Sequence, residues 1–162
     1  MEVCDYLYAN TTFILHTLRT ANHFLQNLHL RTLRSIRIIS IHWSIGIDEV
    51  DEEYGKLRTT PWNEWVALIH CLSSADGLNS LRIRIFGRRR CVQEKALVEP
   101  LSVLQVPNFT IHLPWPIGYL SEHVFNSDTK GVFEIQRPTL EWALARDQPY
   151  PNKKKKGFTF RA

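Results

Sequence analysis

The sequence contains few of the residues from which metal sites and disulfide frameworks are built. It has only three cysteines, Cys4, Cys71 and Cys91, and they are widely spaced. No C-x-x-C pair occurs, and the odd cysteine count argues against a zinc knuckle or a set of disulfides. We therefore expect free, buried thiols in a protein of a reducing compartment, intracellular and either cytoplasmic or nuclear.

Catalytic signatures are also missing. No G-x-S-x-G, phosphate-cradling glycine loop or H-E-x-x-H motif occurs, and seven glycines leave little room for tight phosphate loops. His70 and Cys71 are adjacent on a predicted helix, so their side chains point in different directions and cannot act as base and nucleophile. The sequence predicts that the protein is not an enzyme and has no catalytic residue, no metal site and no cofactor.

Long apolar runs are absent as well. No stretch approaches the roughly 18 residues of a membrane span, and no signal-peptide pattern opens the chain. Of the 162 residues, 44% are apolar and 22% are charged, which are values typical of a globular protein. We expect a soluble protein without a membrane partner, with one α/β domain over residues 1–146 and a flexible basic tail over residues 147–162.

The positive charge is concentrated locally. Lysine and arginine number 20 against 16 acidic residues, and without Lys153, Lys154, Lys155 and Lys156 the balance is 16 against 16. These four lysines resemble a short nuclear import signal. Together with the run Arg88–Arg90 they indicate an alternative function, that of a nuclear or nucleic-acid-associated protein. The neutral body does not favour nucleic acid as the partner, because a nucleic-acid binder normally carries a basic face on its folded domain.

An apolar pattern, Φ-x-x-Φ-x-Φ-x-Φ, occurs three times. Its last three apolar positions alternate, which is typical of a strand with one buried face, and the first packs the turn that leads into the strand. This is the spacing of leucine-rich-repeat strands. We predict an α/β fold with a short, leucine-rich-repeat-like open sheet of mainly parallel strands and helices on one face; a generic α/β domain is the alternative. The three copies are Ile36, Ile39, Ile41 and Trp43; Leu78, Leu81, Ile83 and Ile85; and Val106, Phe109, Ile111 and Leu113.

The segments between these strands have helical signals. Apolar residues at helical spacing predict a helix over about residues 18–30. Before the second strand, a hydroxyl cap at Thr60 followed by Pro61 predicts a helix start, and Gly77 predicts a left-handed stop. A third helix, before the third strand, should be broken or kinked at Pro100.

The strand positions that alternate with the apolar ones are polar in all three copies. A sheet buried on both faces does not tolerate such a row, so this face should be open, either as solvated surface or as a ligand-facing surface. A metal site is not expected there, because a guanidinium group repels a cation. The candidate binding face consists of Ser40, Arg82 and Thr110 in one column and His42, Arg84 and His112 in the next.

The ends of the predicted sheet are less regular. Residues 5–15 contain a strand signal after a turn at Asn10, residues 132–136 contain another, and Pro138 opens a short helix. The acidic run Asp48–Glu53 lacks the glycine and distal glutamate of an EF-hand and is interpreted as a solvated loop.

The first strand of a repeat fold exposes part of its core unless it is capped. Four apolar residues, Tyr6, Tyr8, Phe13 and Leu15, would then lie at an exposed edge. We expect the isolated chain to self-associate through this edge or to express poorly.

Residues 4–13, CDYLYANTTF, resemble the "LLYS-NTF" stretch of a large fungal family of unknown function. Later features match the layout of that family over residues 3–115: Ser35-Ile36-Arg37 opening a strand that ends in Trp43, a helix around Trp65, Gly77-Leu78, and Glu99-Pro100-Leu101. The resemblance implies a leucine-rich-repeat-like α/β fold and a fungal source. In that family an F-box-like motif usually precedes the stretch, and here Met1 leaves no room for it, so we expect a truncated relative or one without the adaptor role.

The sequence therefore predicts a non-enzymatic protein-interaction module that uses the candidate binding face. The partner is expected to be a protein, and the resemblance to an F-box-associated family is consistent with that expectation.

Overall fold

The computed structural model describes residues 3–51, 56–87, 94–116 and 133–139. Five strands form one sheet in the order β1-β2-β5-β6-β7, and every neighbouring pair is parallel. This confirms the predicted α/β class and the parallel sheet. The strands are β1 (Thr12–Leu15), β2 (Ile38–Ser44), β5 (Ser80–Phe86), β6 (Asn108–His112) and β7 (Glu134–Gln136), and a small antiparallel pair is formed by β3 (Val50–Asp51) and β4 (Lys56–Leu57).

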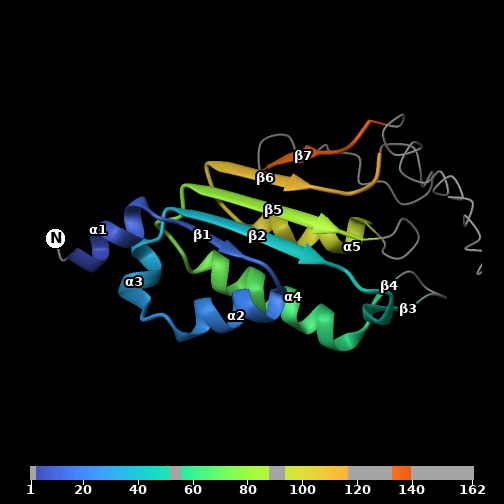
Figure 1. Cartoon of the computed structure of the whole chain (residues 1–162), viewed down its shortest axis with the longest axis horizontal. Helices are drawn as coiled ribbons and strands as arrows, with labels where there is room; N and C mark the ends of the chain where they lie inside the picture. The colour runs from blue at the N-terminus through green and yellow to red at the C-terminus, as the bar shows by residue number, and fades with distance from the viewer. Residues whose placement is uncertain (1–2, 52–55, 88–93, 117–132, 140–162) are drawn as a thin grey trace, which may run out of the picture.

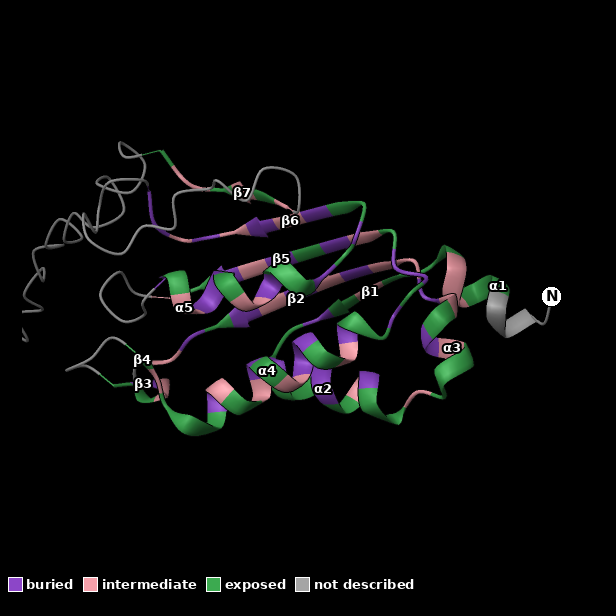
Figure 2. Cartoon of the chain, turned by 180° about the vertical axis from the view of Figure 1, so that it is seen from behind, coloured by how far each residue is buried: buried purple, intermediate pink, exposed green. Residues whose placement is uncertain are grey.

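Helices cover one face of this sheet. Figure 1 shows the five strands in front of α5, and Figure 2, from behind, shows α4 and α5 in front of the strands. In both views α1 and α3 lie at the amino-terminal end of the strands. The α-helices are α1 (Val3–Asn10), α2 (Leu18–Asn27), α3 (Leu30–Ser35), α4 (Thr59–Ser73) and α5 (Glu94–Val98), and two short 3-10 helices are η1 (Ile47–Glu49) and η2 (Glu99–Val103).

The apolar repeat forms the centre of the core. All three copies of the pattern are buried. The strand register places Ile39, Leu81 and Phe109 side by side, and it does the same for the equivalent positions two residues later. Each strand thus contributes one apolar residue to each layer beneath the sheet, as the shared spacing predicts.

Tryptophans connect the helical layer to the sheet. Trp65 of α4 is fully buried, and its ring stacks on that of Trp43 at the end of β2, with 5.2 Å between ring centroids. Its indole nitrogen donates a hydrogen bond to the carbonyl oxygen of Leu97 in α5, 3.2 Å away. Because a buried indole N–H needs an acceptor, this bond ties α4 to α5.

The helix boundaries differ from the predictions. The helix expected over residues 18–30 ends at Asn27, and the separate helix α3 follows it. The predicted Thr60 cap is wrong, because α4 begins at Thr59 with Arg58 as the capping residue and no side-chain cap bond. The break at Pro100 is present, since η2 takes over from α5 there.

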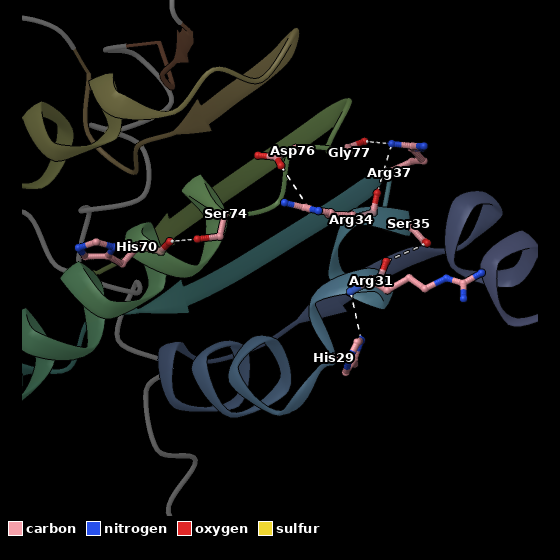
Figure 3. A network of polar contacts seen from close by, with 9 residues as sticks. All are labelled: His29, Arg31, Arg34, Ser35, Arg37, His70, Ser74, Asp76 and Gly77. Atoms are coloured by element: carbon pink, nitrogen blue, oxygen red, sulfur yellow. Dashed lines mark hydrogen bonds and ion pairs between the residues drawn. The ribbon is translucent and has the colours of Figure 1, made fainter.

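Gly77 has a different role from the predicted helix stop. The helix α4 ends at Ser73, four residues earlier, with Ser74 in a right-handed conformation as its cap. Gly77 instead lies against the end of α3, where a Cβ atom would overlap the carbonyl oxygen of Arg34. Its own carbonyl oxygen accepts a hydrogen bond from Nη1 of Arg37 at 2.6 Å (Figure 3).

The amino-terminal edge is more covered than expected. Leu15 is buried, so its predicted exposure is wrong, and Tyr8 and Phe13 are half-buried with stacked rings 5.4 Å apart. Only Tyr6 of the four predicted residues is exposed, at 60%. The cause is packing from two helices: Tyr8 of α1 stacks on Phe13, and α2 packs against β1, with the ring of Phe24 5.2 Å from that of Phe13.

Several predictions concern residues outside the described ranges. They are the loop Arg88–Arg90, most of the helix after Pro138, and the tail over residues 147–162 with Lys153–Lys156. The described helices include none with both the length and the apolar character required to cross a membrane.

Candidate functional site

The strand register brings the candidate binding face together. Ser40 pairs with Arg82, which pairs with Thr110, and His42 pairs with Arg84, which pairs with His112. Because side chains on a strand alternate between the two faces, these polar residues lie opposite the buried apolar ones. Figures 1 and 2 place the labelled helices on the other side of the sheet or at its ends, so no described helix covers this face.

The outer strands extend both columns. On β7, Glu134 pairs with Thr110 and Gln136 pairs with His112. On β1, Ile14 pairs with Ser40, and its side chain is 53% exposed. The three-copy pattern could not reveal these residues, because β1 and β7 do not carry the complete apolar repeat.

An aromatic chain crosses the same face. The ring of His42 packs edge-on against that of His16 at 5.3 Å and against that of Phe86 at 6.1 Å. Phe86 is 45% exposed, which is unusual for so large an apolar side chain. It was missed as a candidate, although it continues the outward alternation of Arg82 and Arg84 by one further step.

The two guanidinium groups supply the positive charge of this face. Arg82 is exposed and Arg84 is half-buried. Within the described part of the chain, neither forms an ion pair or a hydrogen bond. Their charge is therefore available to an acidic ligand.

The histidines of the face are held in the neutral form. Burial lowers the pKa of His42, and the charge of Arg84 and the neighbouring His16 lower it further. Burial also lowers the pKa of His112, with added lowering from Arg84 and Arg82 and a smaller opposing effect of Glu134. Desolvation and a nearby positive charge both disfavour the imidazolium, so at neutral pH the charge of the face comes from the arginines.

These pKa shifts predict how stability depends on pH. As the pH falls below about 6.5, the unfolded chain takes up protons at His42 and His112 before the folded chain does. The free energy of unfolding should therefore decrease, and the decrease should be smaller in the double variant His42→Asn, His112→Asn. Urea denaturation from about pH 7.5 to about pH 5.5 measures it. The control is His23→Asn, on an exposed residue of α2; equal pH slopes in all three proteins would refute the assignment.

A cavity lies at the carboxyl end of β5, β6 and β7. We call it the strand-end cavity; its volume is about 380 Å³. It continues the candidate binding face, because Arg84 and His112 belong to both. The lining residues are Arg84, Ile85, Phe86, His112, Leu113, Pro114, Gln136, Arg137 and Pro138.

A second cavity, of about 530 Å³, lies at the carboxyl end of β1 and β2 and is lined by both acidic and basic side chains. Glu49 lies at its wall, and its Oε2 accepts hydrogen bonds from the indole nitrogen of Trp43 at 3.4 Å and from the backbone nitrogen of Gly46 at 3.1 Å. The expected solvated acidic loop is therefore corrected at this position: Glu49 is half-buried and bonded. Residues 52–53 of that run lie outside the described ranges.

A buried ion pair holds the last strand in place. Glu94, at the start of α5, binds both terminal nitrogens of Arg137, which directly follows β7. The same carboxylate accepts a bond from the indole nitrogen of Trp115 at 2.6 Å. The side chain of Glu94 is 3% exposed and that of Arg137 is 8% exposed. No sequence signal pointed to this pair, because its members are 43 residues apart and lie in no shared pattern.

Two further predictions concern the thiols and metal binding. Cys71 is free and half-buried, and burial raises the pKa of its thiol. Over the ranges that the structure describes, no three His, Cys, Asp or Glu residues are grouped in a way that could hold a metal ion.

The sheet, with helices on one face and a cationic face that none of the described helices covers, defines a parallel α/β domain. A family described as a domain of unknown function (DUF7730) matches residues 1–138, and the chain belongs to this family. Comparisons with curated proteins and with solved structures give no match.

Proposed function

We propose that this DUF7730 domain is a non-enzymatic protein-interaction module whose candidate binding face binds an acidic segment of a partner protein. The observation that carries the proposal is the pair Arg82 and Arg84 on a strand face that no described helix covers, without an ion-pair partner among the described residues. Unpaired guanidinium groups on a rigid strand favour carboxylate ligands, because the planar fork can bind a carboxylate through two hydrogen bonds.

A protein segment fits this face better than a nucleic acid. Glu134 lies in the same column as Arg82, so the face combines two guanidinium groups with one carboxylate and suits a ligand with few negative charges better than a phosphate backbone. The ring of His42 packs edge-on against those of His16 and Phe86, an arrangement that differs from a row of free stacking platforms. The charge balance without the four tail lysines is neutral, which also favours a local acidic ligand over a polyanion.

The fungal source and the F-box-like association remain part of this proposal. They rest on the resemblance of residues 4–13 and of the later motifs to a fungal family with F-box-like neighbours. Such neighbours support a role in protein recognition inside the cell, which agrees with a strand face that no described helix covers and with the free thiol of Cys71.

The test is direct binding of a fluorescent acidic peptide, acetylated and amidated at its ends and made of alternating Glu, Asp and Gly residues. The double variant Arg82→Glu, Arg84→Glu should weaken binding at least about tenfold, because charge inversion turns attraction into repulsion. The matched control is Lys95→Glu, which changes one exposed charge on α5, on the covered side of the sheet. Anisotropy titrations measure all three proteins.

Two outcomes would contradict the proposal. If the native chain and the double variant bind the peptide with equal affinity, the candidate binding face is only solvated surface. Tighter binding of a single-stranded oligonucleotide than of the peptide, with a steep loss of affinity as salt rises, would favour the nucleic-acid alternative instead.

A further inference from the structure

We infer that the strand-end cavity binds the free C-terminal carboxylate of a polypeptide whose last residue is apolar. This inference rests on the proposed function and deepens it, because the cavity adjoins the candidate binding face. A volume of about 380 Å³ is at the small end of the range of ligand pockets, so the cavity suits one terminal residue better than a folded element.

The polar groups of the cavity suit a single carboxylate. Two arginines line it, but the guanidinium of Arg137 is already bound by Glu94. Arg84 therefore offers the free positive charge among the described lining residues. One free guanidinium matches the single charge of a carboxylate better than the double charge of a phosphate.

Two neutral groups stand beside that guanidinium. His112 lines the cavity, and its Nε2 is buried without a hydrogen-bond partner in the described structure. A buried polar nitrogen without a partner costs free energy. Because this nitrogen has almost no accessible surface, a ligand oxygen in the cavity would bond to it only if the imidazole ring turned toward the cavity with Nε2 protonated. Gln136 pairs with His112 across the strands and adds an amide to the same wall.

The other walls are apolar. They are formed by the ring of Phe86 and by Pro114 and Pro138, in the segments that follow β6 and β7. A bound residue must therefore present an apolar group and a carboxylate close together. An internal Asp or Glu carries its carboxylate on a short polar side chain, whereas a C-terminal Leu or Phe presents both groups in one residue.

The test compares three N-terminally acetylated peptides with the same number and spacing of residues. The first contains four alternating Glu and Asp residues, then Gly, and ends in Leu with a free carboxylate. The second is identical but amidated at its C-terminus, and the third replaces Glu and Asp by Gln and Asn and keeps the free carboxylate. We expect the free acid to bind the native chain about tenfold more tightly than the amide, which is the gain typical of one charged hydrogen-bonded contact.

Single variants separate the cavity from the rest of the face. Arg84→Met should abolish the difference between acid and amide, and Gln136→Ala should reduce it. Arg82→Met, on the same strand and the same face but not among the cavity-lining residues, should weaken both peptides equally and keep the tenfold difference. Thermal unfolding of each variant checks that the fold is retained.

The outcomes distinguish this inference from the function on which it rests. Equal affinity for acid and amide, with loss of binding in Arg82→Met, overturns the cavity assignment and leaves the acidic-segment proposal standing. Failure of all three peptides to bind overturns both. Retention of the acid–amide difference in Arg84→Met overturns the cavity assignment as well.

Discussion

Glu94→Ala should lower the free energy of unfolding by about 3–5 kcal/mol, which is the typical cost of breaking a buried ion pair by removing one partner. The variant leaves the guanidinium of Arg137 charged, 8% exposed and without its carboxylate. It also removes the acceptor of the Trp115 indole N–H. Urea denaturation followed by tryptophan fluorescence measures the change.

The ion pair matters because β7 is a weak edge strand. It has three residues and, among the described strands, pairs with β6 alone. Its central residue, Ile135, is only half-buried, so packing alone contributes little to holding this strand. We therefore expect β7 to detach first in Glu94→Ala. Amide protection should then be lost at Leu113, whose N–H donates to the carbonyl oxygen of Gln136, before it is lost in the rest of the sheet.

The chain contains its own control for this experiment. Arg34 and Asp76 also form an ion pair, at 3.3 Å, but their side chains are 58% and 67% exposed. Asp76→Ala should therefore cost no more than about 1 kcal/mol. The apolar double variant Glu94→Met, Arg137→Met should recover most of the lost stability, since no charge is left buried. A cost of Glu94→Ala equal to that of Asp76→Ala would refute the argument.

Gly77→Ala should lower the free energy of unfolding by about 3 kcal/mol, which is at the upper end of the cost of overpacking a folded interior. A Cβ atom at this position would overlap the carbonyl oxygen of Arg34 and lie 2.9 Å from its carbonyl carbon. These are backbone atoms of α3, so they cannot rotate away as a side chain can. The nearby Nη1 of Arg37, which bonds to the carbonyl oxygen of Gly77, would also have to move (Figure 3).

Gly87→Ala is the matched control. A Cβ atom there would lie 3.5 Å from Cβ of Ile45, which is an ordinary contact. We expect this variant to change the free energy of unfolding by less than about 1 kcal/mol. Thermal or urea unfolding compares the two variants. If they are equally stable, close approach to α3 is not the reason for glycine at residue 77.

The strand pattern shows how far the sequence predicts the fold. Alternating apolar residues in three copies predicted three parallel strands, and the register pairs the equivalent residues, as with Ile41, Ile83 and Ile111. The same offsets predicted that Arg82 lies between Ser40 and Thr110. Both predictions hold because each strand repeats the same local spacing, and parallel pairing then aligns the equivalent positions of neighbouring strands.

The strand-end cavity was less predictable. Arg84 and His112 were candidates from the pattern, but Gln136 and Phe86 were not. Gln136 belongs to a strand of three residues, which is too short to show a period. Phe86 looks like a core residue by type, and only its position in the alternation places it on the outer face.

The sequence by itself determined the α/β class, the parallel central strands and the order of polar and apolar residues across them. These features depend on periods of two and about 3.6 residues, which adjacent positions encode. Only the tertiary structure decided that Glu94 meets Arg137, that Gly77 lies against Arg34 and that His16 reaches His42. These contacts join separate segments, so they depend on how the helices and edge strands dock, and no local pattern encodes that docking.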